Sequence, residues 1–216
     1  MISDPLRLYD TAPVGRAMLA VFGAGGFTVQ MLPTLEKMAT GGIDIRILDD
    51  RATGQVGDFP IVTSETVPAD CPTVIAVSDG AVRAGIADRL GPRPIGSLTA
   101  ATAQVSRHAT IAPGAIVAEF CVIEPMVRIG RHFHANLFSY VAHECVIGDF
   151  VTLAPRVSCN GNVRIGDHVY IGTGASIRQG AHDRPLIIGA GAHIGMGSIV
   201  TRDVPPGTRV RAQAAY

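Results

Sequence analysis

A repeat of six residues governs the second half of this chain. Thirteen consecutive hexads can be written from residue 105 to residue 182 without a slip, and eleven of them begin with Val, Ile or Leu. The fifth position holds Ala, Val, Cys, Ser or Phe, whereas the third and fourth positions collect Pro, Gly, Asp, Arg, His and Asn. A helix would show a period of about 3.6 residues and a half-buried strand a period of 2, so neither explains the pattern.

A period of six predicts a β-solenoid, in which each hexad supplies one short strand and one corner and three hexads close a coil. We expect residues at the first and fifth positions to face the interior, as at Ile147 and Val163. The repeat breaks at residues 181–187, where we expect a small loop. After Pro205 and Pro206 we expect the chain to leave the coils.

The first half has a different pattern, in which apolar strand candidates are separated by a helix candidate. The strand candidates cover residues 18–23, 43–50 and 73–77, and the amphipathic helix covers residues 79–90. This order predicts a small, Rossmann-like parallel sheet. We therefore divide the chain into an extension (1–17), an α/β domain (18–97), a β-helix (98–205) and a tail (206–216).

A glycine turn follows the first strand candidate. It contains Gly23, Gly25 and Gly26, but a dinucleotide fingerprint would need a further glycine where this chain has Thr28, so NAD binding is not supported. Such a turn can still bring backbone N–H groups close to a phosphate at a helix start, or it can be a tight turn without a ligand. Pro33 predicts that the following helix starts late.

Composition narrows the class of protein. The 216 residues are 47% hydrophobic, and 18 basic and 18 acidic residues give a formal net charge of zero. This balance offers no electrostatic argument for binding nucleic acid or an anionic membrane. No apolar run reaches the roughly 18 residues of a membrane-spanning helix, and the first residues lack the apolar core of a signal peptide. We expect a cytoplasmic protein.

The four cysteines form no CxxC pair, so zinc or redox chemistry is weakly supported. Three of them occupy interior positions of the hexads and should be inert core residues: Cys121, Cys145 and Cys159.

The seven histidines occupy different hexad positions. The fourth position, an exposed corner where we expect solvated side chains, holds His108, His132 and His168. The sixth position, an outward-facing strand residue, holds His134, His182 and, after the break, His193. His143 differs because it lies at the third position and Glu144 follows it at once.

The neighbours of His143 along the solenoid can be read from the repeat. Three hexads separate His143 from Gly161 on one side and from Pro125 on the other, so these residues should stack at the same corner. Neither can supply a side-chain ligand, so we expect no metal site. A glycine beside a corner histidine leaves an open notch and an accessible backbone N–H. From position alone, a merely solvated His143 remains the alternative to a functional one.

Two motifs together resemble a known family. The block NLFSYVAHECVIGDF, followed by CNGNVRIG, and the domain with the GAGG turn and LDD at residues 48–50 resemble bacterial sugar-nucleotide acetyltransferases of the sialic-acid O-acetyltransferase and bacillosamine or perosamine N-acetyltransferase type. The resemblance covers about residues 18–210. It implies a left-handed parallel β-helix, and acetyl transfer from acetyl-CoA to a nucleotide-linked 4-amino-4,6-dideoxy sugar in surface glycan biosynthesis.

The resemblance also implies roles for individual residues. His143 would be the general base, Glu144 would orient it, the Gly161 N–H would bind the oxyanion, and Asn136 would lie near the acetyl thioester. The nucleotide of the sugar would be held by these residues: Gly23, Gly25, Gly26 and Asp49 or Asp50. A homotrimer would bind acetyl-CoA between neighbouring prisms.

Two departures from the family pattern leave alternatives open. Phe27 stands where the family usually has histidine after the glycine turn, and the chain ends in AQAAY instead of glycine-x-proline-alanine. One alternative is an O-acetyltransferase that uses a sugar hydroxyl. The other is a catalytically silent protein that only binds the sugar nucleotide.

Overall fold

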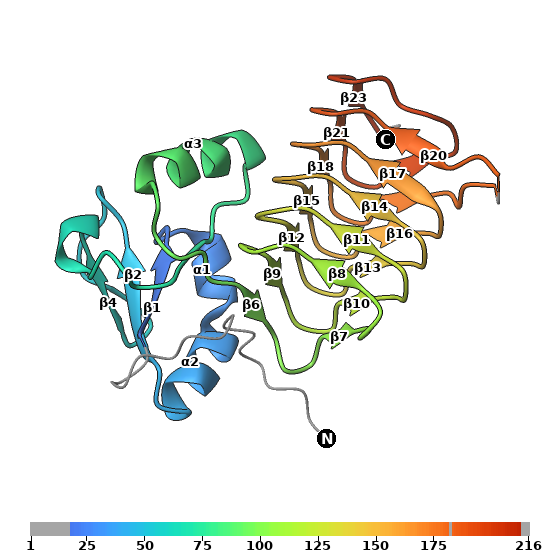
Figure 1. Ribbon diagram of the computed structural model, residues 1–216. Coiled ribbons are helices and arrows are strands. Elements are labelled where there is room, and N and C mark those ends of the chain that lie inside the picture. Colours follow the sequence, from blue (N-terminus) through green and yellow to red (C-terminus); the bar gives the residue numbers. More distant parts are fainter. Residues whose placement is uncertain (1–17, 182, 213–216) are drawn as a thin grey trace.

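The computed structural model describes residues 18–181 and 183–212 (Figure 1). The expected extension at residues 1–17, His182 and residues 213–216 of the expected tail lie outside the described residues. The described chain forms a small α/β sheet followed by a stack of short strands, and the two parts pack side by side. No helix in these described ranges is both long and apolar enough to cross a membrane.

The α/β sheet has five strands in the order β3-β4-β2-β1-β5. Their bounds are β1 (Met18–Phe22), β2 (Asp44–Leu48), β3 (Gln55–Val56), β4 (Phe59–Val62) and β5 (Thr73–Ile75). The three predicted strands are present and parallel, whereas β3 runs antiparallel to β4. The sequence did not indicate β3 and β4, because one has two residues and the other contains Pro60.

Helices cover both faces of this sheet. They are α1 (Gly26–Gln30), α2 (Leu32–Thr40) and α3 (Gly80–Leu90), with a 3₁₀ turn at η1 (Ser64–Thr66). Leu19 and Val21 of β1 belong to the core cluster of α1 and α2, whereas Ala20 and Phe22 pack in the cluster of α3. A strand buried on both faces reads as an uninterrupted apolar run, which is why β1 was recognisable. Pro33 lies in the first turn of α2, where proline is tolerated, but the expected late start is wrong, because the short helix α1 already begins at Gly26.

The rest of the described chain forms three parallel sheets that surround one core. The first contains β6 (Leu98–Thr99), β9 (Ile116–Val117), β12 (His134–Ala135), β15 (Thr152–Leu153), β18 (Tyr170–Ile171), β21 (His193–Ile194) and β23 (Arg209–Val210). The second contains β7 (Gln104–Val105), β10 (Val122–Ile123), β13 (Tyr140–Val141), β16 (Ser158–Cys159), β19 (Ser176–Ile177) and β22 (Ile199–Val200). The third contains β8 (Thr110–Ile111), β11 (Arg128–Ile129), β14 (Val146–Ile147), β17 (Val163–Ile165) and β20 (Leu186–Ile188). The first sheet faces the α/β part (Figure 1).

The predicted register of the hexads is confirmed. Ile147 pairs with Ile165 and Val141 with Cys159, in each case 18 residues along the chain. Ile147 is 2% exposed and Val163 is fully buried. The three cysteines at interior positions are buried, as expected. Ala181 at a fifth position is an exception, because it is exposed at the start of the loop where the repeat breaks.

The break in the repeat is an insertion. Ile165 pairs with Ile188, so this coil spans 23 residues, and a bridge between Ala181 and Arg184 closes the small loop. The expectation that the chain leaves the coils after Pro206 is wrong, because β23 pairs with β21. Proline is tolerated there because Pro205 and Pro206 lie between strands, where no ladder N–H is needed.

The corners share one backbone conformation. Nine corner residues other than glycine have φ between 53° and 63°, and all occupy the fourth position of a hexad. This left-handed conformation is uncommon outside glycine and asparagine, so the solenoid imposes it coil after coil. Glu144, with φ 62°, is one of the nine.

Candidate active site

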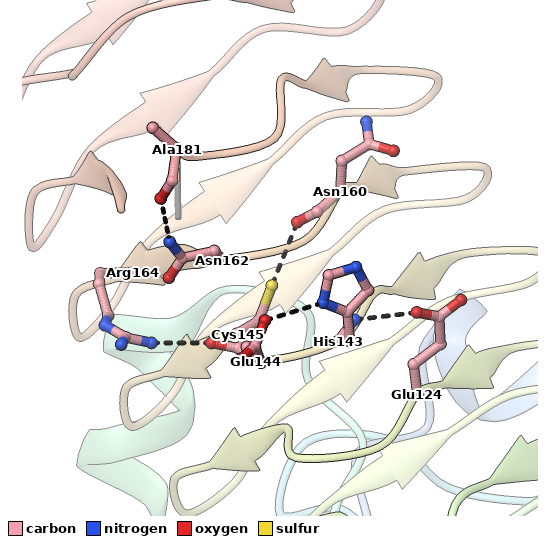
Figure 2. Close-up of polar contacts among 8 residues, drawn as sticks. All are labelled: Glu124, His143, Glu144, Cys145, Asn160, Asn162, Arg164 and Ala181. Carbon is pink, nitrogen blue, oxygen red and sulfur yellow. Dashed lines mark hydrogen bonds and ion pairs between the residues drawn. The ribbon is translucent and has the colours of Figure 1, made fainter. Parts of the chain in front are cut away.

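His143 and Glu144 form the corner between β13 and β14. The left-handed backbone at Glu144 turns its carboxylate back, so that Oε2 lies 3.1 Å from His143 Nδ1 (Figure 2). Arg164 Nη1 donates to the Glu144 carbonyl oxygen at 2.9 Å and holds the corner from the next coil. A carboxylate that accepts from Nδ1–H leaves the lone pair on Nε2, which is the arrangement that a general base needs.

Gly161 stacks on the imidazole, as the 18-residue offset predicts. A Cβ at position 161 would lie 2.7 Å from His143 Cε1 and 2.8 Å from Nε2, so any side chain there would displace the ring. The Gly161 N–H makes no hydrogen bond to any residue in the described part of the chain. It is therefore free to donate to a ligand beside His143.

A groove of about 420 Å³ opens beside this corner. It is lined by Val122, Glu124, Tyr140, Ala142, His143, Asn160, Gly161 and Gln179. The Tyr140 hydroxyl donates to Asn160 Oδ1 at 2.8 Å, and the His143 N–H donates to Glu124 Oε2 at 2.9 Å. Three lining residues have no counterpart among the candidate residues of the sequence: Glu124, Asn160 and Gln179. The repeat could have found them, because each lies one 18-residue offset from Ala142 or Gly161.

Asn136 lies away from this groove. It follows β12 directly, one corner before β13. Its Oδ1 accepts hydrogen bonds from Gln30 Nε2 and from the Leu137 N–H. It lines a separate cavity of about 80 Å³ between the two parts of the chain, together with Phe27 and Ser78. One copy of the chain thus does not bring Asn136 and His143 together.

The glycine turn is at the carboxyl end of β1. Gly23 has φ 110° and needs to be glycine, whereas an added Cβ at Gly25 or Gly26 would have no atom of residues 18–181 or 183–212 within 4 Å. The strand order reverses at β1, and β5 ends beside it, so the turn lies at a topological switch point, where open α/β sheets usually bind ligands.

Asp49 and Asp50 already have partners within the protein. Asp49 accepts from the Ala24, Arg51 and Ala52 N–H groups at 2.9–3.0 Å. Burial favours the neutral acid, but these three hydrogen bonds and the Arg51 charge outweigh it and lower the pKa of Asp49. Asp50 pairs with Arg89 at 3.0 Å. Asp49 therefore fixes the glycine turn, and Asp50 remains the more exposed of the two.

Arg83 of α3 joins the two parts of the chain. Its side chain is fully buried and, among the described residues, donates only to neutral acceptors: the carbonyl oxygens of Val77, Ser78, His132 and Val151 and the hydroxyl of Thr152. Thr152 in turn donates to the Ser78 carbonyl at 2.7 Å. Burial lowers the pKa of Arg83 to about 10, and the Asp79 charge opposes part of this shift. Arg83 thereby fixes the segment after β5 against β12 and β15.

The expectation that His132 is solvated is wrong, and His134 is buried although it faces outward from the coils as expected, because the α/β part covers the sheet that carries them. His132 is 3% exposed and stacks on Phe150, and His134 is fully buried against Phe27. Burial, followed by the positive charges of Arg83 and Arg131, lowers the pKa of His132 to about 4. Burial also lowers the pKa of His134 well below its usual value. His108, His168 and His193 are exposed, as expected.

No group of three or more His, Cys, Asp or Glu side chains within residues 18–181 and 183–212 is arranged to hold a metal ion. The site instead offers a basic nitrogen, an orienting carboxylate and a free backbone N–H beside an open groove. A basic nitrogen of this kind can take a proton from an attacking group, and a free N–H can stabilise an oxyanion, which are the two requirements of acyl transfer.

Comparison with known proteins identifies the family. No family model matches the sequence. The chain is 39% identical over 206 residues to the GDP-perosamine N-acetyltransferase of Escherichia coli O157:H7, a match that covers 89% of this chain and 92% of the relative. The chain belongs to the GDP-perosamine N-acetyltransferase family.

Two solved structures share the architecture. WeeI from Acinetobacter baumannii AYE is 36% identical, with a TM-score of 0.83 over 93% of this chain and 99% of that one. The acetyltransferase domain of PglB from Neisseria gonorrhoeae FA1090, in complex with acetyl coenzyme A, is 28% identical, with a TM-score of 0.83 over 94% of this chain and 99% of that one.

Proposed function

We propose that this protein transfers the acetyl group of acetyl-CoA to the amino group of a nucleotide-linked amino-deoxy sugar of the 4-amino-4,6-dideoxy type. The observation that carries the proposal is the corner at which Glu144 orients His143 beside the free Gly161 N–H. The named activity of the E. coli relative and the acetyl coenzyme A bound to the PglB domain support it. We place the reaction in the cytoplasm, where acetyl-CoA is available, and assign it no membrane or nucleic-acid partner.

The residues at the corner can perform the steps of acetyl transfer. The neutral sugar amine attacks the thioester carbonyl, and the carbonyl oxygen becomes an oxyanion that the Gly161 N–H stabilises. His143 Nε2 takes the proton that the nitrogen loses, and Glu144 stabilises the resulting imidazolium. Collapse of the intermediate breaks the carbon–sulfur bond, and His143 returns the proton to the thiolate of CoA. The products are the N-acetylated sugar nucleotide and free CoA.

The position of Asn136 favours a homotrimer. If Asn136 contacts the acetyl thioester, a neighbouring copy must supply it, because one chain holds Asn136 and His143 in separate cavities. Acetyl-CoA would then lie between neighbouring prisms, which we take to be left-handed β-helices. Light scattering should give three times the chain mass of 22.5 kDa. A monomer at micromolar concentration would contradict this assembly.

The α/β part is proposed as a Rossmann-like domain that holds the nucleotide. Its glycine turn lies at the switch point between β1 and β5, with Gly23, Gly25 and Gly26 near the phosphates and Asp49 or Asp50 near the ribose or base. Gly25 and Gly26 leave room for a ligand to approach the backbone closely.

Gly25→Val tests this nucleotide site. Gly25 has φ −85° and an added Cβ meets no atom of the described residues within 4 Å, so valine should be accommodated without disturbing the fold. We expect KM for the sugar nucleotide to rise about tenfold or more, equivalent to about 1.4 kcal/mol of binding, because the branched side chain obstructs the phosphates. KM for acetyl-CoA should be unchanged. Equal losses for both substrates would indicate a folding defect instead.

A thiol-release assay tests the function itself. Acetyl-CoA would be combined with a panel of UDP- and GDP-linked amino sugars and with the corresponding hydroxyl sugars. We expect CoA release with an amino sugar. Release with hydroxyl sugars alone would show an O-acetyltransferase, and binding without any release would show a silent sugar-nucleotide-binding protein.

A further inference from the structure

We propose that Glu124 is the specificity-determining residue that recognises the acceptor amine as an ammonium ion. The inference rests on the proposed function and adds a reason for the enzyme to choose an amine over a hydroxyl. Glu124 follows β10 and lies one coil before Ala142, on the wall of the same groove as His143. Figure 2 shows its carboxylate beside the His143 backbone.

The carboxylate of Glu124 is held beside the reactive histidine. Its Oε2 accepts from the backbone N–H of His143 at 2.9 Å. Its Oε1 makes no hydrogen bond to any residue that the structure describes, so this oxygen remains available to a ligand. Glu124 is therefore fixed at one oxygen and open at the other, next to the ring whose Nε2 must face the same nitrogen.

The charges of the residues that line the groove also favour a cationic ligand. Among the described residues that line it, Glu124 contributes the one carboxylate, and none is lysine or arginine. A primary amine is largely protonated at neutral pH, so it arrives as a cation. An unbalanced carboxylate attracts that cation, whereas a sugar hydroxyl carries no charge. The groove should therefore bind an amino sugar more tightly than its hydroxyl counterpart.

Recognition as ammonium fits the proton balance of the reaction. The bound R–NH₃⁺ first releases one proton to solvent water, which frees the nitrogen lone pair. The nitrogen then forms its bond to the acetyl carbon and loses its second proton to His143 Nε2. Glu124 stabilises the charged form that binds, and His143 acts on the neutral form that attacks.

Glu124→Gln and Glu124→Ala separate charge from positioning. Glutamine keeps an oxygen that can accept from the His143 N–H, whereas alanine removes both the charge and the acceptor. For Glu124→Gln we expect KM for the amino sugar to rise about tenfold, with kcat and KM for acetyl-CoA near their original values. Glu36→Gln removes one carboxylate from an exposed position of α2 and should change nothing.

Binding measurements without turnover provide the decisive readout. Calorimetry with free CoA in place of acetyl-CoA would give the affinity for the sugar nucleotide as a function of pH. The original protein should lose affinity as the amine becomes neutral at higher pH, and Glu124→Gln should show a much flatter dependence. The hydroxyl counterpart should bind both proteins equally.

Two outcomes would overturn the inference in different ways. If Glu124→Gln binds the amino sugar as tightly as the original protein, with the same pH dependence, and only Glu124→Ala is impaired, Glu124 merely holds the His143 corner. If the original protein neither binds nor acetylates any nucleotide-linked amino sugar, the proposed function fails, and the role of Glu124 fails with it.

Discussion

His143→Ala should lower kcat by about 10²- to 10⁴-fold, the usual range for loss of a general base. The amine would then have to lose its proton to water, while the Gly161 N–H and the groove remain in place. Acetyl-CoA should still bind, because the proposal assigns the coenzyme no contact with this side chain. Thiol release under saturating substrates measures the loss, and a variant with near-normal kcat would show that the amine attacks unaided.

Glu144→Ala is the matched comparison for this variant. We expect a smaller loss, because an imidazole without its orienting carboxylate can still accept a proton. The sugar amine must be neutral to attack, so the two variants must be compared with the same acceptor at the same pH.

Arg83→Met should weaken the junction between the α/β sheet and the β-helix. The carbonyl oxygens of His132 and Val77 would lose their donor, whereas that of Val151 keeps the His134 N–H and that of Ser78 keeps the Thr152 hydroxyl. A buried carbonyl without a donor costs about 1–3 kcal/mol, so we expect the free energy of unfolding to fall by about 3 kcal/mol or more. Urea unfolding measures this change.

The location of the damage tests the role of Arg83 more sharply than its size. Hydrogen exchange should accelerate in α3 and in the segment after β5. The last coils of the β-helix, toward β23, should remain protected. Lys37→Met removes a cation from an exposed position of α2 and should have little effect. An Arg83→Met protein that unfolds and exchanges like the original would show that the five hydrogen bonds contribute nothing net.

The sequence predicted long-range contacts in the β-helix unusually well, because a solenoid converts them into a fixed offset along the chain. The stacking of Gly161 on His143 followed from counting 18 residues, and the burial of Ile147 followed from its first position in a hexad. The same count also predicts the place of Glu124, which lies 18 residues before Ala142 and so belongs to the coil position next to that of His143.

The features that the hexads did not predict depend on what lies outside the coils. His134 occupies an outward position, and its burial requires the α/β part to cover that particular sheet. Nothing in the hexads specifies which of three equivalent faces is covered. Arg83 was hidden for the same reason, since an arginine in an amphipathic helix normally lies in water. The hydrogen-bond acceptors of Arg83 in the β-helix, from His132 to Thr152, lie 49 to 69 residues away in the sequence, and the others belong to the α/β part.

The uniform left-handed corners have a consequence for how such a site can arise. Glu144 adopts the same backbone conformation as eight other corner residues, so the reactive pair requires no backbone change peculiar to its own coil. Amino-acid substitutions alone could place a His–Glu pair at the corner of another coil, provided that the residue stacked on the histidine in the next coil is a glycine. Each such move would shift the pair along the stack by about 4.8 Å, the spacing between neighbouring strands. If the nucleotide and the catalytic histidine are placed as we propose, the coil that carries the histidine determines how far the sugar must extend from its nucleotide to be acetylated.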